Sequence, residues 1–535
     1  MDSLTPQVPI RQRAMPRVNW PLRRSAFFLA VFSITVAGVW RLADLMGDGG
    51  FTPIEIAILI VFTLNFSWIA GAFVTALIGF LLKVMSDRPV AVASPIFTID
   101  PAGERPVGRT AIAVPVFNEA TDDVFARLHA LANSLRRTGA RDCFDLFLLS
   151  DSSDEAVAAS ERVEVDRFRA IHGGPGSLRY RRRETNEGKK AGNIADFCRQ
   201  WGDDYDYLVV LDADSVMSGD ALLRLARLMD ARPNAGIIQT LPRLIGQNSL
   251  FGRLEQFGYR LCCDVMALGL AFWQGPDGNY FGHNAIVRLA AFRDHCELPT
   301  VRGRGPLAGE IMSHDFVEAA LLRRAGYEIW FVPDGRGSFE GCPENAVDHA
   351  KRDRRWCQGN LQHAWLLTMR GLRPLSRLHL IIGITSYVAS LWWLMLIVLG
   401  IAARMTADVV PDYFAGALAL FPTWPIDRSF GFFSLLMVTL FLLFMPKVFG
   451  LTLLLFDNEG PDRLGGKLKL LLSAVIEALY SALRAPVLMV FHTMFIVMIF
   501  LGRRIGWDPQ VRDARTVGLK TAFWLHLPQT LFALA

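Results

Sequence analysis

The chain has 535 residues, of which 52% are hydrophobic, and its formal net charge at pH 7 is only +5. This composition is more apolar than that of an ordinary soluble protein, and so small a charge gives no reason to expect a nucleic-acid partner. The seven cysteines contain no C-x-x-C pair. They therefore argue against a zinc site or a disulfide framework and favour a reducing compartment.

Two long apolar stretches come first, over residues 27–45 and 54–82. Each is long enough to cross a hydrocarbon core of roughly 30 Å as a helix. Arginines are concentrated before the first stretch, the connection carries no lysine, and basic residues follow the second. Because cytoplasmic flanks are enriched in lysine and arginine, the pattern predicts a cytoplasmic arm over residues 1–26, two transmembrane helices over 27–83, and a return to the cytoplasm.

Residues 84–376 change character and alternate short apolar runs with polar, helix-like segments. Such alternation is typical of a mostly parallel α/β sheet. We therefore expect a cytoplasmic α/β domain here, with interfacial helices toward its C-terminal end. Ligands of such sheets bind beyond the C-terminal ends of the strands. The expected buried strands are residues 112–117, 146–150, 207–211 and 236–239, with helices over 122–137 and 220–230.

Apolar segments resume in a C-terminal transmembrane region, residues 377–535. Within it, residues 378–401 and 430–456 are long and apolar enough to be expected as spans. The last apolar stretch, residues 522–535, is short for a span and stops at the end of the sequence. The sequence therefore predicts at least two further spans, with a last one that is truncated.

The stretch at residues 468–501 is ambiguous, because Glu477, Arg484, Pro486 and His492 interrupt its apolar character. Charged residues are costly inside a membrane, and proline bends a helix. The pattern fits either a transmembrane hairpin or a helix that lies along the membrane interface and is followed by a broken one. We expect an interfacial helix here.

Polar residues follow the first two expected strands. Pro115 ends the first strand, and Asn118 and Glu119 then offer polar groups where a nucleotide can lie. Asp151 ends the second strand, where its carboxylate can accept hydrogen bonds from a base or a ribose. An ordinary turn and a helix N-cap use the same residue types. Neither pattern decides the function by itself.

A loop rich in glycine and lysine comes next and contains Lys189 and Lys190. Its lysines can bind a pyrophosphate, although a basic surface loop before a helix has the same composition. After the next strand, Asp212 and Asp214 place two carboxylates one residue apart, where they can share Mg²⁺ or Mn²⁺ with two phosphates. Such an ion would offset the charge that develops on a departing nucleoside diphosphate.

A third acid, Asp315, opens a later helix, where it can act as general base for an acceptor hydroxyl or cap the helix. Asp214 and Asp315 are therefore the catalytic candidates. Arg352, Arg355 and Trp356 precede the next apolar segment. The arginines can hold a diphosphate and the tryptophan can stack on a sugar, but a basic juxtamembrane helix with an interfacial tryptophan has the same pattern.

The order of these motifs decides more than any one of them. Asp151, Asp212-x-Asp214, Asp315 and Arg355-Trp356, with spans on both sides, resemble the processive, membrane-integrated members of glycosyltransferase family 2, such as bacterial cellulose and hyaluronan synthases. The resemblance implies a GT-A type nucleotide-sugar transferase domain inserted between groups of transmembrane helices. It also implies that Asp151 contacts the uracil and that Asp212 and Asp214 contact the ribose and the metal. Asp315 would be the general base. Arg355 and Trp356 would hold the diphosphate and the acceptor.

Two departures from the family pattern resemble a narrower group. Ser313-His314-Asp315 stands where T-E-D is usual, and Arg352 replaces the glutamine of Q-x-x-R-W. With the runs at residues 279–284 and 354–360, these variants are similar to the glucosyltransferases H of osmoregulated periplasmic glucan synthesis. That group implies UDP-glucose as donor and an inverting transfer at a Gram-negative inner membrane. It also implies a glucan, β-1,2-linked in many members, that is delivered to the periplasm.

The same resemblance places Phe281, His283 and Asn284 beside the acceptor sugar. There an aromatic ring can stack on a pyranose and polar side chains can bind hydroxyls, although Phe281 suits core packing equally well. Membrane lipids are expected around the spans. An acyl carrier protein and a periplasmic glucan-processing protein are further candidate partners.

Residues 502–517 are rich in arginine and are expected to be cytoplasmic. In cellulose synthases this place holds a mobile gating loop, so Trp507 and Arg512 are expected to reach the donor, although the F-x-V-T-x-K pattern is absent. Two other functions stay open. One is transfer to a lipid acceptor, with spans that only anchor the enzyme. The other is a transporter with a cytoplasmic regulatory domain.

Overall fold

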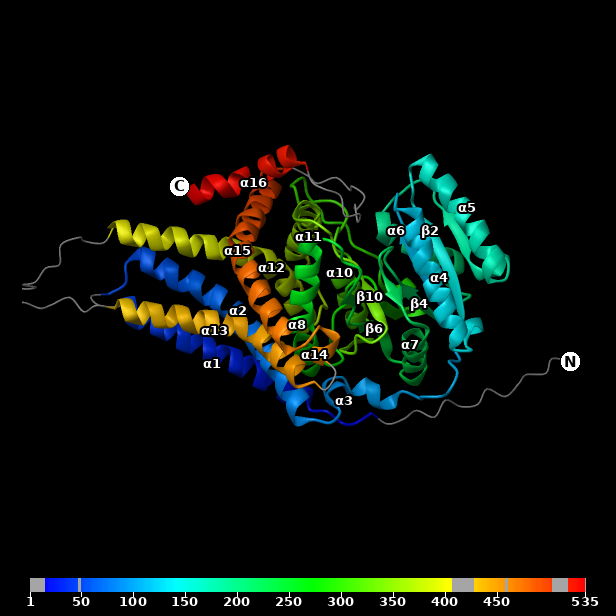
Figure 1. Ribbon diagram of the computed structural model, residues 1–535, viewed down its shortest axis with the longest axis horizontal. Coiled ribbons are helices and arrows are strands. Elements are labelled where there is room, and N and C mark those ends of the chain that lie inside the picture. Colours follow the sequence, from blue (N-terminus) through cyan, green and yellow to red (C-terminus); the bar gives the residue numbers. More distant parts are fainter. Residues whose placement is uncertain (1–14, 47–49, 407–427, 458–459, 503–517, 535) are drawn as a thin grey trace, which may run out of the picture.

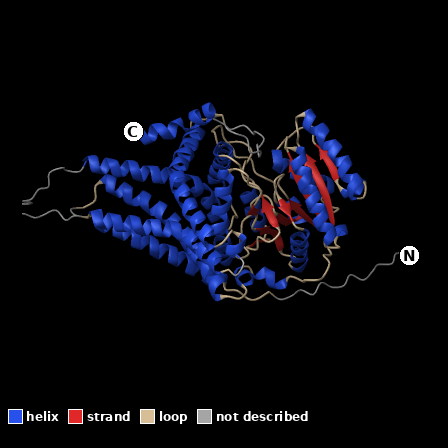
Figure 2. Ribbon diagram, in the orientation of Figure 1, coloured by secondary structure: helices blue, strands red, loops and turns tan. Residues whose placement is uncertain are grey.

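The computed structural model describes residues 15–46, 50–406, 428–457, 460–502 and 518–534. Figure 1 shows a bundle of long helices at one end of the molecule and an α/β domain at the other, with α8, α11 and α15 between them. The strands gather in the α/β domain (Figure 2). A layer of helices therefore separates the apolar bundle from the sheet.

Four helices of the bundle extend side by side away from the α/β domain (Figure 1): α1 (Trp20–Met46), α2 (Pro53–Met85), α12 (Pro374–Thr406) and α13 (Ser429–Phe456). With α15 (Lys467–Phe500), they are the five helices among the described residues that are long and apolar enough to cross a membrane. At the start of α2, the Glu55 N–H donates to the Thr52 hydroxyl at 3.3 Å and the Thr52 N–H donates to the Glu55 carboxylate at 2.8 Å. This capping box fixes where the helix begins.

Residues 468–501, which the sequence left ambiguous, lie in one continuous helix up to Phe500. α15 passes through Pro486 without ending, and contacts with α8, α11 and α12 support it. In Figure 1 it runs across the direction of α12 and α13, at the end of the bundle that faces the α/β domain. The helix has neither the turn of a hairpin nor a break. Its neighbours in this layer are α8 (Leu250–Gln274) and α11 (Ala346–Leu366), and α16 (Leu519–Leu534) also contacts it.

A seven-stranded mixed sheet with the order β3-β2-β1-β4-β8-β6-β9 forms the α/β domain. Neighbouring strands are parallel except at β8, which runs antiparallel to β4 and β6. The four strands expected from the sequence correspond to β1, β2, β4 and β6. The strands are β1 (Thr110–Val116), β2 (Phe144–Ser150), β3 (Arg179–Arg182), β4 (Tyr207–Val210), β6 (Ala235–Thr240), β8 (Ala285–Arg288) and β9 (Glu328–Val332). A smaller sheet has the order β5-β10-β7, with β5 at Val216–Met217, β10 at Ser338–Glu340 and β7 at Arg243–Leu244.

Side chains that alternate along each strand supply two cores. In β1, Ile112 and Val114 face one core, whereas Ala111 and Ala113 face the other, as the pleat of a strand requires. Helices cover both faces, so ligands reach the sheet beyond its strand ends. The covering helices are α4 (Thr121–Arg137), α5 (Glu155–His172) and α7 (Gly219–Ala231) on the first face, and α6 (Lys189–Trp201), α9 (Leu289–His295) and α10 (Asp315–Arg324) on the second.

A buried carboxylate joins the α/β domain to the membrane helices. Asp277, in the loop after α8, accepts hydrogen bonds from Arg24 of α1 at 2.6 Å and from Arg323 of α10 at 2.7 Å. Its backbone carbonyl lies 2.8 Å from Nε2 of His379 in α12. Buried charges are tolerated when they are paired and hydrogen-bonded. This contact therefore fixes α10 relative to two membrane helices.

Glycines let α8 lie directly against the membrane helices. A Cβ atom at Gly79 of α2 would overlap the Val265 carbonyl oxygen, and one at Gly269 of α8 would overlap the Thr75 carbonyl oxygen. Gly450 of α13 is equally close to the backbone of α8. Small residues at such crossings allow helix backbones to touch. These contacts hold the intermediate layer against the bundle.

We predict that Gly269→Val forces α8 away from α2 and destabilises the protein. Overpacking of this kind costs on the order of 1–3 kcal/mol, so the thermal melting midpoint in detergent should fall by several degrees. Gly71→Val on α2, where an added Cβ meets nothing within 4 Å, is the matched control and should melt like the wild type. Unchanged melting of Gly269→Val would contradict the importance of this contact.

Candidate active site

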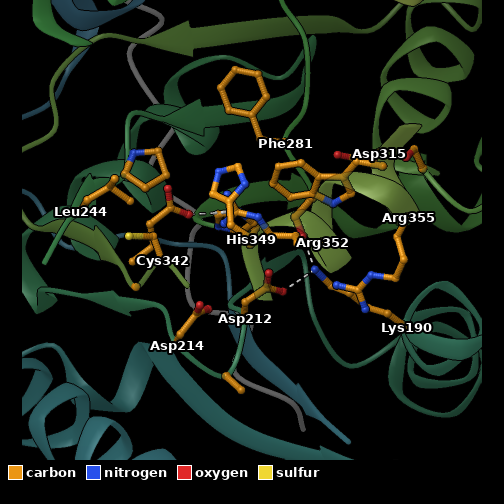
Figure 3. Close-up of a pocket in the computed structure, with 18 of the residues that line it drawn as sticks. Lys190, Asp212, Asp214, Leu244, Phe281, Asp315, Cys342, His349, Arg352 and Arg355 are labelled. Atoms are coloured by element: carbon orange, nitrogen blue, oxygen red, sulfur yellow. Dashed lines mark hydrogen bonds and ion pairs between the residues drawn. The ribbon is translucent and has the colours of Figure 1, made fainter. Parts of the chain in front are cut away.

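A cavity of about 1040 Å³ lies beyond the C-terminal ends of β1, β2 and β4. Its walls come from the loops after these strands, from the start of α10, from α11, and from the membrane-side helices α8, α12, α13 and α15. Figure 3 shows part of its lining. The residues selected from the sequence that line it are Pro115, Glu119, Asp151, Lys189, Lys190, Asp212, Asp214, Phe281, His283, Asp315, Arg352, Arg355 and Trp356.

An arginine that sequence reasoning missed holds Asp151 in place. Arg183 donates to both carboxylate oxygens, from Nε and Nη2, at 2.7 Å each, and Asn186 donates to the Asp151 backbone carbonyl at 2.7 Å. This bidentate pair orients the carboxylate where the second strand ends. Asn118 does not line the cavity, because its amide donates to Ser153 Oγ at 3.0 Å and secures the turn instead.

Asp212 and Asp214 follow β4 and both reach the cavity, with Lys190 pointing at Asp212 (Figure 3). Lys190 Nζ donates to Asp212 Oδ1 at 2.5 Å and to the Gly282 carbonyl oxygen at 2.8 Å. The lysine therefore joins the first carboxylate to the turn that precedes β8. Its charge also balances Asp212 in this partly buried place.

Glu340, which sequence reasoning also missed, adds a carboxylate beside this pair. It ends β10 (Ser338–Glu340), and its Oε2 lies 3.3 Å from His283 Nε2. Burial raises the pKa of Glu340, His283 opposes that rise, and Asp214 and Asp212 add to it. The accumulated negative charge fits a divalent cation. No described group of three or more His, Cys, Asp or Glu could hold a metal alone, so a cation on Asp212 and Asp214 would need ligand phosphates to complete its coordination.

The candidate base lies next to the turn that Lys190 contacts. Asp315 begins α10, and a Cβ atom at Gly282 would lie 3.4 Å from the Asp315 Cβ and 3.5 Å from its Oδ2. Gly282 has a φ of +83°, a conformation that favours glycine. The turn therefore passes close to the carboxylate, and Asp212 and Asp315 are linked through Lys190 and this one backbone segment.

Helix α11 holds the loop that carries Asp315. The Met312 N–H donates to Gln362 Oε1 at 2.9 Å, and His363 Nε2 lies 2.8 Å from the Ser313 carbonyl oxygen. Burial lowers the pKa of His363, so the ring is neutral at pH 7 and its one N–H donates to this carbonyl. The same helix that lines the cavity therefore positions Asp315, the candidate base.

The arginine and tryptophan motif faces the cavity from α11. Arg352, Arg355 and Trp356 all line it, and the Arg352 guanidinium lies 4.6 Å from the centre of the Trp356 ring. The indole is 47% exposed, which leaves a face available for stacking. Gly359, one turn further on, allows the helix to lie against Ser313, because a side chain there would overlap the serine hydroxyl.

Other residues selected from the sequence have different surroundings. Asn284 does not line the cavity: it is fully buried, and its amide donates to Ser338 Oγ at 2.9 Å and to the Phe339 carbonyl at 3.1 Å. Phe281 lines the cavity and also packs edge-on against Phe331 with ring centres 5.7 Å apart. Trp507 and Arg512 lie outside the described residues.

Two family models match the chain. Glycosyl transferase family 2 matches residues 111–296, and glycosyl transferase family group 2 matches residues 207–501. A Vibrio cholerae protein named glucans biosynthesis glucosyltransferase H is 45% identical over 93% of this chain and 68% of its own length. A Shewanella baltica protein of the same name is 42% identical over 94% of this chain and 69% of its own length. The chain belongs to glycosyltransferase family 2 and, within it, to the family of the glucans biosynthesis glucosyltransferases H.

Family membership confirms the resemblance inferred from the motifs. The family 2 domain, the mixed α/β sheet and the flanking apolar helices confirm the expected GT-A type fold, and the chain is a glycosyltransferase rather than a transporter. A solved mannosyltransferase from Pyrobaculum calidifontis, in complex with GDP-Man and Mn²⁺, aligns with 76% of this chain and 99% of its own at 13% identity and a TM-score of 0.42. That likeness is too remote to carry an argument about ligands.

We predict that His363→Ala in this glycosyltransferase lowers kcat about fivefold with little change in donor KM. The loop that carries Asp315 loses one hydrogen bond, worth about 1 kcal/mol, while the nucleotide end keeps its contacts. His363→Gln retains a side-chain N–H and should restore most of the rate. Steady-state kinetics with labelled donor tests this. An equal loss in both variants, or a loss confined to KM, would contradict the positioning role.

Proposed function

We propose that this enzyme transfers glucose from UDP-glucose to a growing osmoregulated periplasmic glucan, with inversion, and passes the glucan outward between its membrane helices. One observation carries the proposal: a single cavity contains Asp212, Asp214, Asp315 and Trp356 and continues between the membrane-side helices. The relatives named glucans biosynthesis glucosyltransferase H support a glucan product. We propose that the glucose units of the glucan backbone are joined by β-1,2 linkages.

In this proposal the donor lies along the strand ends. Its uracil rests near Asp151, and its diphosphate lies by Asp212 and Asp214, which would hold Mg²⁺ or Mn²⁺ together with phosphate oxygens. The ion supplies charge stabilisation for the departing UDP. Lys190 and the α11 arginines Arg352 and Arg355 add positive charge at the same end. Pro115, Glu119 and Lys189 complete the lining around the nucleotide.

Asp315 is proposed to accept the proton of an acceptor hydroxyl. The hydroxyl oxygen bonds to the anomeric carbon of glucose while the bond from that carbon to the β-phosphate oxygen breaks. Attack and departure on opposite faces invert the anomeric centre. Trp356 offers an exposed face on which the acceptor sugar can stack, and His283 and Phe281, which also line the cavity, are proposed as further acceptor contacts.

The surroundings proposed for the enzyme follow from its charge distribution. Basic residues flank the ends of α1 and α2 that adjoin the α/β domain, which supports a cytoplasmic N-terminus and catalytic domain in a Gram-negative inner membrane. The exposed apolar side chains of the bundle would face lipid. An acyl carrier protein and a periplasmic glucan-processing protein are proposed partners.

We predict that Asp315→Asn abolishes elongation but preserves UDP binding, because the amide fills the same space and accepts no proton. Asp214→Ala should instead weaken UDP binding at least tenfold in the presence of Mg²⁺ and much less in its absence. Calorimetric UDP titration and analysis of products from labelled UDP-glucose measure both effects. Near-normal turnover by Asp315→Asn would falsify the base assignment. A product of one sugar on a lipid would favour the lipid-acceptor alternative.

We further predict that Trp507→Ala and Arg512→Ala each reduce donor affinity and turnover severalfold, since the segment that contains them is proposed to close over the nucleotide. UDP-glucose KM and kcat in detergent provide the measurement. Arg404→Ala, which changes an exposed arginine in the last turn of α12 that does not line the cavity, is the comparison variant. Kinetics identical to the wild type in both test variants would remove the gating role.

A further inference from the structure

The cavity has a second end that the transfer chemistry does not use. Besides Trp356 and the strand-end residues, its lining includes Lys447 of α13, Ser481 and Glu477 of α15, and Glu255 of α8. These residues lie on helices whose other faces are largely apolar. Ionisable residues in such surroundings are rare and usually mark a function. Their contacts indicate what that function is.

Lys447 lies at the centre of a compact hydrogen-bonded group. Its Nζ donates to Glu477 Oε1 at 2.8 Å, to Glu477 Oε2 at 3.0 Å and to Ser481 Oγ at 2.8 Å. Ser481 Oγ also donates to Glu477 Oε1 at 2.6 Å. The group joins α13 to α15, and all three side chains line the cavity.

A second ion pair adds to this group. We call the five side chains together the polar stripe: Glu255, Lys447, Glu477, Ser481 and Arg484. Arg484 of α15 pairs with Glu255 of α8, and its guanidinium lies 5.1 Å from the ring centre of Phe251. Glu477, Ser481 and Arg484 are four and then three residues apart, so they occupy one face of the helix. That face is turned toward α8 and the cavity.

Burying these charges is costly, and the fold makes room for it. The Glu477 side chain is only 4% exposed, and an apolar pair of similar size is often at least as stable as a buried ion pair. Gly258 of α8 is needed beside it, because a Cβ atom there would lie 2.5 Å from Glu477 Oε1. Structural stability alone therefore does not explain the stripe.

The chemistry of the stripe points to a neutral, hydroxyl-rich ligand. Its two cations and two carboxylates sum to zero charge, and together with Ser481 they contain both hydrogen-bond donors and acceptors. Tyr259 and Tyr387 also line the cavity and carry aromatic rings. A nucleotide would need excess positive charge, and a lipid tail would need an apolar wall. A sugar polymer needs neither.

We propose that Lys447, Glu477, Ser481, Arg484 and Glu255 form a binding site for hexose units already added to the product, separate from the transfer centre. This inference rests on the proposed glucan synthesis and names the side chains and helices that receive the product. The ligand of this site is a neutral oligosaccharide. The stripe lies where α8, α13 and α15 meet, so the product would leave Trp356 toward these helices.

The test uses the full chain in lipid nanodiscs with a β-1,2-linked glucohexaose as probe. Lys447→Met/Glu477→Leu removes the central pair without leaving a lone charge. We expect at least a tenfold loss of hexaose affinity by calorimetry and a shift of the products from UDP-glucose to shorter chains. Arg41→Met/Asp44→Leu removes an ion pair far from the cavity and should bind the hexaose like the wild type.

Ser481→Ala, a milder change, keeps the test decisive if the double variant fails to fold, and should weaken hexaose binding severalfold. Melting and UDP titration check folding. Hexaose binding that is absent in the wild type, or equal in the wild type and both stripe variants, overturns the proposed site. A different result would separate the two proposals. If the wild-type protein makes no glucan but its hexaose binding still depends on the stripe, the proposed function is contradicted and the proposed binding site is not.

Discussion

Asp277 carries the contact on which the relation between membrane and catalytic domain depends. Arg24 of α1 and Arg323 of α10 both donate to its carboxylate, and His379 of α12 lies against its carbonyl. Removing one partner would strand a buried charge, at a cost of about 3–5 kcal/mol. Since α10 begins with Asp315, the same contact sets the height of the candidate base above the membrane helices. The position of the chemistry is thus a consequence of how the domain docks.

Helix α11 provides the second connection between the two parts. On one side it holds the loop before Asp315, and on another it packs against α12 and α15. Asp353 on its buried face lies 3.2 Å from His349 Nδ1 and 3.4 Å from Nε2 of His492 in α15. Burial alone would raise the pKa of Asp353, but these hydrogen bonds lower it. A displacement of α15 would therefore act on the helix that presents Trp356 and steadies the base.

The cavity is lined by side chains of different chemistry from the sheet and from the membrane-side helices. Carboxylates and lysine gather at the strand ends, where a metal and a diphosphate would meet. The exposed indole of Trp356 lines the cavity from α11, and charge-balanced pairs line it from α8, α13 and α15. The proposed reaction has a charged leaving group and a neutral product, which suit different surroundings. The strand ends of the sheet and the three membrane-side helices would supply these two surroundings.

The sequence by itself determined the long apolar helices, the four strands and the carboxylates that follow them, since these depend on local composition, on periodicity and on the rule that ligands collect at strand ends. Only the tertiary structure decided that Arg183 holds Asp151, that Glu340 stands beside Asp214 and that Asn284 lies buried. It also decided that residues 467–500 form one helix through a proline. Each depends on packing between segments far apart in the chain, which no local pattern records.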